Sequence, residues 1–401
     1  MSHTQAIEFN QLPRVRLAGA WDAQLIVVCV TLLMLGLVMV ASASVSLGQA
    51  HYNDALHYFN RQVLFAGLGL AVLLIVVRIP TAAWLVSGPV MIVLAYLMLV
   101  VVLIPGVGHE VNGSTRWLPL AVFQLQVSEA AKLLILIYLA GYLERRGREV
   151  RESAWGFIKP MLLLSVAGLL LLLEPDFGAM VVLMAASLAM MFLAGARLLQ
   201  FLALLTFSAT SMVALAYISP YRWKRVVSFM DPWSDPYNSG FQLVQSLIAF
   251  GRGEAWGVGL GGSVQKLFYL PEAHTDFVLA VLAEELGLVG VLLVIALFTL
   301  LVWRAIRIGV QAERKGLLFS AYLSYGIGAW LGLQAFVNIG VNMGVLPTKG
   351  LTLPLMSYGG SSLVITAIAI GLLLRIAYES NTPADVKPVS RNKRKRGKAR
   401  S

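Results

Sequence analysis

Charged residues are scarce in this chain. Only 13% of its 401 residues are Asp, Glu, Lys or Arg, whereas 58% are hydrophobic, and the mean hydropathy is +0.78. A soluble domain does not need so much apolar surface, so the composition excludes a soluble globular protein and indicates a polytopic membrane protein. The apolar runs also lack the alternating pattern of lipid-facing barrel strands, so we expect an all-α fold of membrane-spanning helices.

Cysteine is almost absent. Cys29 is the only one, so an intrachain disulfide is excluded. It lies in an apolar run, Leu25–Val40, which is followed by Ala41-Ser42-Ala43 and could imitate a secretory signal with its cleavage site. Because the apolar stretch continues through small residues and is long enough to span a membrane, we expect a retained helix.

Apolar runs of about twenty residues predict about ten transmembrane helices. The fifth and sixth are short and are separated only by Glu174-Pro175-Asp176, so a re-entrant hairpin is the alternative to the two true spans that we favour. The predicted spans are Ala23–Ser46, Tyr58–Val77, Ala82–Ile104, Val127–Leu143, Met161–Leu173, Phe177–Leu193, Leu198–Ile218, Phe277–Trp303, Leu317–Met343 and Leu353–Tyr378.

Basic residues cluster at one side of these spans. Arg14 and Arg16 precede the first span, and further basic groups follow the fourth, the eighth and the tenth. With ten spans all these groups share one side, so the positive-inside rule places both termini in the cytoplasm. The predicted parts are a cytoplasmic segment 1–22, a ten-helix domain 23–378 with a large outer loop 219–275, and a basic cytoplasmic tail 379–401.

The tail contains the run "RNKRKRGKAR". Such a run is typical of a segment that lies against anionic membrane lipids. Nucleic-acid binding is the other interpretation, but no recognition fold accompanies the run, so we expect no nucleic-acid partner.

Several cations stand in the predicted outer loops, against the positive-inside trend. Contact with phospholipid headgroups is the simple explanation for each of them. Arg116 and Lys349 differ because each lies in a short loop rich in Gly, Ser, Thr and Pro, where a lone cation can form a fixed site for a phosphate group. The others are Arg222, Lys224, Arg225, Arg252 and Lys266.

The fourth predicted span begins with polar residues. Glu129 and Lys132 are three residues apart and therefore share a helix face. They are either a self-neutralising pair that makes membrane insertion less costly or the polar wall of a substrate cavity, and both can hold.

The stretch "LPEAHTDFVLAVLAEELG" places ionisable groups at the start of an apolar run. On a continuous helix Glu284 would lie about 12 Å deeper than Asp276 and about 80° around the axis, which excludes a tight carboxylate pair. We therefore expect Glu284 and Glu285 to brace the bundle through buried partners. Asp276, beside His274 at the outer membrane surface, is a candidate general base. With nearby cations, it could deprotonate a hydroxyl that attacks a carbon bearing a phosphate-type leaving group.

Five sequence blocks, in order, resemble the SEDS (shape, elongation, division and sporulation) family. They are "NGSTRWLPL…QVSEAAK", "EPDFG", "QLVQSLIAFGRG", "GVGLGGSVQKLFYLPEAHTDFVLAVLAEELG" and "PTKGLTLPLMSYGGSS". The resemblance covers about residues 20 to 378 and favours the division branch over the elongation branch. One mild departure is Val127 before Ser128-Glu129, where the family usually has Pro or Ala.

The resemblance implies a ten-helix glycosyltransferase of the bacterial inner membrane, concentrated at the division septum. Its substrate would be lipid II, an undecaprenyl-diphosphate-linked disaccharide-pentapeptide, polymerised at the outer face. Its partners would be a class B penicillin-binding protein that supplies the transpeptidase, other divisome membrane proteins and membrane lipids. The family's essential aspartate matches Asp276, and the substrate-binding candidates are Arg116, Glu129, Lys132, His274, Lys349 and Ser361.

Two other functions stay open at this point. A lipid II flippase would also have about ten helices and intramembrane charges, and a divisome scaffold would bind partners without chemistry. No cofactor is expected from the residues, although Mg²⁺ or Mn²⁺ could be carried by the substrate diphosphate.

Overall fold

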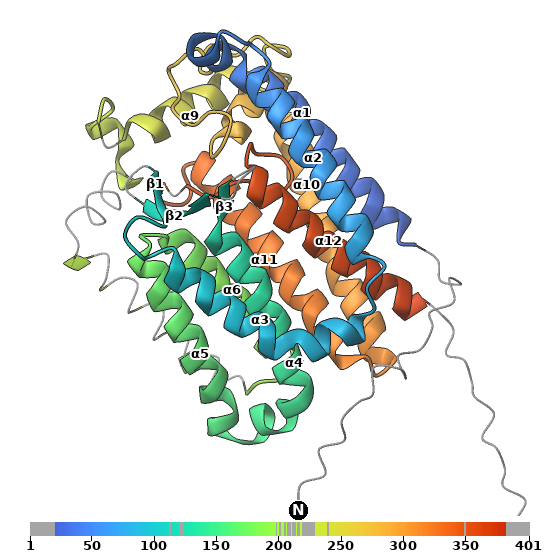
Figure 1. The fold of residues 1–401 in the computed structure, drawn as a ribbon. Helices are drawn as coiled ribbons and strands as arrows, with labels where there is room; N and C mark the ends of the chain where they lie inside the picture. The colour runs from blue at the N-terminus through green and yellow to red at the C-terminus, as the bar shows by residue number, and fades with distance from the viewer. Residues whose placement is uncertain are drawn as a thin grey trace, which may run out of the picture.

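The computed structural model describes residues 21–381, apart from 112–113, 120–123, 198, 200–201, 204–205, 207–209, 211–213, 215–216, 219–228, 239 and 349 (Figure 1). Most of the predicted seventh span, 198–218, and the basic tail lie outside the described residues. The same holds for Lys349 and for Arg222, Lys224 and Arg225.

Long helices account for most of the described chain (Figure 1). They are α1 (Ala23–Tyr52), α2 (His57–Val76), α3 (Thr81–Val101), α4 (Val127–Glu152), α5 (Ala154–Leu173), α6 (Phe177–Leu193), α9 (Phe241–Gly253), α10 (Val278–Arg314), α11 (Leu318–Asn342) and α12 (Gly360–Asn381), with a short 3-10 helix η2 (Pro232–Ser234).

Six of the described helices are long and apolar enough to cross a membrane, namely α1, α2, α3, α5, α10 and α12, and α6 is a shorter apolar helix. Helices α4 and α11 contain more polar residues and are largely buried between their neighbours. In the described part of the chain, nine of the predicted spans correspond to helices. The expectation of an all-α, polytopic membrane fold is confirmed.

The start of α1 and the end of α12 lie at the same end of the bundle. Trp21, just before α1, and Tyr378, in the last turn of α12, have ring centroids 4.9 Å apart. At the same end, Glu379 accepts hydrogen bonds from the backbone and hydroxyl of Thr81, at the start of α3. The first and last described helices thus begin and end on one side, as an even number of spans requires. The opposite end, in the upper left part of Figure 1, carries the strands, α9 and the connection between α1 and α2.

A small antiparallel sheet, which the sequence did not predict, follows α3. Its order is β1 (His109–Val111), β2 (Ser114–Pro119) and β3 (Gln124–Gln126). The hydroxyl of Ser114 donates to the carbonyl of Glu174, and the backbone N–H of Gln126 donates to Ser361 Oγ at 3.2 Å. The sheet is therefore held against both the α5–α6 turn and the start of α12.

The predicted span Phe277–Trp303 corresponds to α10, but this helix is broken at Gly287, which the sequence did not indicate. This residue has φ 66° and ψ −165°. The N–H groups of Val258 and Gly259 donate to the carbonyls of Glu284 and Glu285 at 2.9 and 3.1 Å. A second segment thus satisfies the backbone groups that the break releases.

The predicted start of the last span, Leu353, is wrong, since α12 begins at Gly360. The preceding segment contains Pro354 and ends its turn with Leu355 at φ 65°, a conformation incompatible with a helix. Ser357 Oγ accepts a hydrogen bond from the backbone N–H of Leu353 at 2.8 Å and stabilises this turn.

Candidate functional site

Asp276 lies just before α10, which begins at Val278, as the predicted span Phe277–Trp303 implies. Its side chain is half-buried, and none of the described residues donates a hydrogen bond to the carboxylate. Burial raises the pKa of Asp276 to about 7, the negative charge of Glu272 adds to this, and the positive charge of Arg116 opposes it. The carboxyl is therefore poised between its acid and base forms near neutral pH.

Arg116 on β2 faces a fixed carboxylate, that of Asp176. Its Nη1 atom is 3.6 Å from Asp176 Oδ2, and 22% of its side chain remains exposed. Its Nε atom is buried and has no hydrogen-bond partner among the described residues. A guanidinium has five N–H donors, so Arg116 retains capacity to bind an anion.

Asp176 is held in place by the start of α6. It accepts hydrogen bonds from the N–H of Ala179 at 3.1 Å, as the helix N-cap, and from the hydroxyl of Ser128 at 2.8 Å. The block "EPDFG" thus positions the partner of Arg116, which our sequence analysis missed. An Asp directly before an apolar run was the available signal, because it is a typical N-cap.

Glu174, in the same turn, is a buried carboxyl without a described partner. Both of its carboxylate oxygens are inaccessible and unbonded in the described structure. Burial raises the pKa of Glu174 to about 8, with a further contribution from Asp176, while Arg116 lowers it. At neutral pH this carboxyl is mostly protonated, so it adds little negative charge near Arg116.

Glu129 and Lys132 form the predicted pair. Lys132 Nζ lies 2.8 Å from Glu129 Oε1 and donates a second hydrogen bond, also of 2.8 Å, to Gln334 Oε1. The ammonium also lies 5.2 Å from the ring centroid of Trp330, and the Lys132 side chain is fully buried. The self-neutralising pair is confirmed, and the role of these residues in substrate binding remains a prediction.

His274 lies in an aromatic cluster two residues from Asp276. Its ring centroid is 4.8 Å from that of Tyr58 and 5.4 Å from that of Tyr358. The N–H of Tyr358 also donates to the carbonyl of His274 at 2.9 Å. Burial lowers the pKa of His274, so the neutral imidazole is favoured and contributes no positive charge to an anion site.

The last sequence block also reaches Asp276. A Cβ atom added to Gly350 would lie 2.7 Å from Asp276 Oδ2, so the backbone of this glycine packs directly against the carboxylate. Ser361 is buried at the start of α12, where its Oγ atom accepts the hydrogen bond from Gln126. Of the sequence-predicted site residues, Arg116 is near enough to Asp276 to lower its pKa. Gly350, which was not predicted, packs against the carboxylate and directly follows the predicted Lys349 in the sequence.

Glu284 and Glu285 brace the bundle, as predicted. Glu284 pairs with Arg252 Nη1 at 2.7 Å, and Glu285 pairs with Lys266 Nζ at 2.7 Å and accepts from the hydroxyl of Ser42. Arg252 and Lys266 were expected to contact lipid headgroups. They instead neutralise the two buried glutamates.

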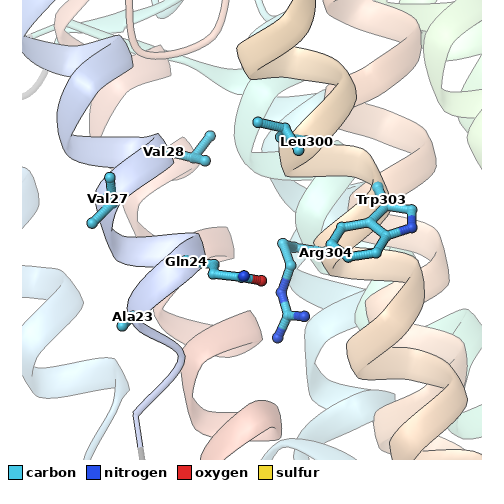
Figure 2. Close-up of a pocket in the computed structure, with 7 residues that line it drawn as sticks. All are labelled: Ala23, Gln24, Val27, Val28, Leu300, Trp303 and Arg304. Atoms are coloured by element: carbon cyan, nitrogen blue, oxygen red, sulfur yellow. The ribbon is translucent and has the colours of Figure 1, made fainter.

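A cavity elsewhere in the molecule is apolar and lies near the far end of α10. It has a volume of about 330 Å³ and is lined by Val27, Val28, Leu300, Trp303 and Arg304 together with Ala23 and Gln24 (Figure 2). Asp276 precedes the other end of α10, so this cavity is not the reaction site. Within the described residues, no group of three or more His, Cys, Asp or Glu side chains is placed to hold a metal ion.

Comparisons with known proteins agree over almost the whole chain. The family model for cell cycle proteins, which covers FtsW, RodA and SpoVE, matches residues 23–382. A probable peptidoglycan glycosyltransferase FtsW of Thioalkalivibrio sulfidiphilus is 59% identical over 371 residues, which cover 92% of this chain and 93% of the relative. The corresponding protein of Coxiella burnetii is 52% identical over 364 residues, covering 91% and 98%.

Solved structures share the fold. One is a chain from a study of how a peptidoglycan synthase complex coordinates polymerization and crosslinking, with a TM-score of 0.72, 31% identity, and coverage of 91% of this chain and 99% of that chain. Another is the rod shape determining protein RodA of Thermus thermophilus, with a TM-score of 0.67, 28% identity and the same coverage.

Proposed function

The chain belongs to the cell cycle protein family of FtsW, RodA and SpoVE, and we propose that Asp276 is the general base of the reaction it catalyses. The chain is a membrane-embedded peptidoglycan glycosyltransferase, like the FtsW proteins that it matches at 50–59% identity. We take lipid II as its substrate. The observation that carries the proposal is a half-buried carboxylate without described hydrogen bonds, whose pKa is affected by a cation with an unbonded Nε atom.

The proposed step is a displacement at a sugar carbon. The carboxylate of Asp276 takes the proton from the acceptor sugar 4-hydroxyl, whose oxygen attacks the anomeric carbon of the donor. A new glycosidic bond forms, the bond between that carbon and the diphosphate oxygen breaks, and undecaprenyl diphosphate leaves with the bonding electrons. A base within hydrogen-bond reach contributes by orienting the hydroxyl as well as by removing its proton.

Arg116 is proposed to bind the diphosphate as it leaves. Its unbonded Nε and its long, 3.6 Å contact with Asp176 support this role, because a phosphate offers shorter, charge-assisted hydrogen bonds. Lys349 precedes Gly350, which packs against Asp276, and we propose it as a second cation for the same group. Glu129, Lys132, His274 and Ser361 remain proposed substrate-binding residues. A divalent cation, where one takes part, would enter with the diphosphate.

The site end of the bundle is proposed to face the outer side of the inner membrane at the division septum, with both chain ends in the cytoplasm. The charge clusters of the sequence support this orientation. Reporter fusions after Arg148 and after Asp235 should then report opposite compartments, and the same compartment for both would contradict it.

A class B penicillin-binding protein is the proposed partner, which would crosslink the strands that this chain polymerises. The similarity to a chain of a peptidoglycan synthase complex supports it. Co-purification and mutual stimulation of the two folded proteins would test the pairing, and the absence of both would argue against it.

The deciding experiment is polymerisation of lipid II by purified protein carrying Asp276→Asn. This change keeps the size of the side chain but removes its basicity, so polymerisation should nearly disappear while lipid II still binds. Asp276→Glu should retain little activity, because a displacement of about 1 Å can cost on the order of a hundredfold. An active Asn variant would remove Asp276 from the mechanism, and a wild-type chain that moves lipid II without lengthening strands would indicate a flippase.

A further inference from the structure

Helix α11 carries three amide side chains at four-residue intervals, Gln334, Asn338 and Asn342, which we call the amide row. Residues four apart share one face of a helix. All three are almost completely buried. Buried amides need hydrogen-bond partners, since leaving a buried polar group unsatisfied is destabilising.

Two members of the amide row hold the backbone of Asp276. The carbonyl oxygen of Asp276 accepts hydrogen bonds from Asn338 Nδ2 at 2.9 Å and from Asn342 Nδ2 at 3.0 Å. Asn342 Oδ1 also accepts from the N–H of Ala280 at 3.1 Å. This N–H belongs to the first turn of α10 and also donates to the carbonyl of Phe277 at 3.0 Å. The start of α10 is therefore fixed to α11 by side-chain amides.

The amide row also holds the segment that follows Gly350. Asn338 Nδ2 donates to the carbonyl of Leu351 at 2.6 Å, and Gln334 Nε2 donates to the carbonyl of Thr352 at 3.1 Å. Asn338 thus connects two segments that are far apart in the sequence. One carries the carboxylate of Asp276, and the other packs its Gly350 against that carboxylate.

We propose that Asn338 is a positioning residue that sets the spacing between Asp276 and the 350–352 segment. Its amide nitrogen uses its two N–H donors on the two backbones, so neither segment can shift without losing a buried hydrogen bond. The proposal rests on Asp276 as the base. It adds that the placement of this base depends on a neutral amide deep in α11.

The test measures kcat and KM for lipid II polymerisation, per folded molecule, in Asn338→Ala, Gly350→Ala and the double variant. We expect Asn338→Ala to lower kcat by on the order of a hundredfold, with KM changed much less, because the base is misplaced by about 1 Å. The Cβ atom added in Gly350→Ala should displace the same carboxylate. The double variant should therefore lose little more kcat than the more impaired of the two single variants. If the loss of kcat in the double variant equals the product of the losses in the two single variants, the two residues act independently and the proposal is overturned.

Two further variants keep the test decisive. Asn338→Gln retains the amide but moves it by one methylene, so it should fold and still show a lowered kcat; a fully active Gln variant would overturn the proposal. Ser324→Ala on α11 removes a buried hydroxyl that has no hydrogen-bond partner in the described structure, and should leave kcat unchanged. If Asp276→Asn is inactive while folded Asn338→Ala is fully active, only the positioning role fails, whereas an active Asp276→Asn overturns the base itself.

Discussion

Asp276 can accept a proton only while it is ionised, and its raised pKa makes that ionisation depend on pH near neutrality. With a pKa of about 7, about one-tenth of the carboxyl is ionised at about pH 6 and about nine-tenths at about pH 8. The folded-state pKa lies above the ordinary value of 3.8, so the base form is lost as pH falls through 7. We expect kcat/KM for lipid II polymerisation to rise about tenfold across this interval.

We call this rise of kcat/KM with pH the acidic limb of the pH profile. Removing the charge of Arg116 should shift it along the pH axis. Arg116 lowers the pKa of Asp276, so Arg116→Gln should shift the limb to higher pH, in addition to slowing the reaction at every pH. Arg116→Lys should leave the limb nearer its original position. The measurement is the initial rate of strand synthesis by purified protein at constant ionic strength, over a pH series.

Glu174 supplies the control, because its pKa is also raised, to about 8. Since Glu174 is mostly protonated at neutral pH, Glu174→Gln replaces one neutral group by another of similar shape, and the limb near pH 7 should persist. A limb that disappears in Glu174→Gln, or one that is flat in the wild-type protein, would refute the assignment to Asp276.

Two predictions concern stability in detergent, measured by thermal unfolding. Lys132→Met leaves the buried carboxylate of Glu129 without its cation and should lower the free energy of unfolding by about 3–5 kcal/mol. Lys132→Met combined with Glu129→Gln should recover most of this loss. Equal stability of the single and the double variant would contradict the buried pair. Gly287→Ala should cost at least about 1–3 kcal/mol, because a Cβ atom would lie 2.4 Å from Gly257 N at a positive φ. The control Gly67→Ala, with open space around the added Cβ on α2, should be neutral or stabilising, and a Gly287 variant that behaves like it would refute the packing argument.

The membrane-spanning elements could be predicted because lipid imposes one rule on them. A span needs about twenty apolar residues and must satisfy its own backbone, so the predicted start of α1 at Ala23 and both predicted limits of α6 agree with the structure. The break in α10 and the late start of α12 could not be predicted in this way. Hydropathy does not record that residues 254–259 satisfy the broken backbone at Gly287, or that Leu353–Gly359 forms a turn.

Charged residues of the site could also be found, because an ionisable group in an apolar run is costly and needs a reason. This argument led to Asp276 and to the expectation that Glu284 and Glu285 have buried partners, although it did not identify Arg252 and Lys266 as those partners. It could not lead to the amide row. Gln and Asn are neutral, and a side chain that binds a distant backbone carbonyl leaves no periodic or compositional signal in the sequence.

The two charged groups of the proposed mechanism are both held by neutral hydrogen bonds to the backbone. Arg116 is carried on β2, whose Ser114 is bonded to the carbonyl of Glu174, and it faces Asp176 of the same turn. Asp276 is held through its own carbonyl by Asn338. In each case the reactive side chain makes no hydrogen bond within the described structure, while the backbone around it is fixed by buried polar contacts. A base and a cation that are rigid in position but unsaturated in hydrogen bonding need little reorganisation when a substrate enters. The cost of misplacing them should therefore appear in kcat, which is where the Asn338 variants are expected to fail.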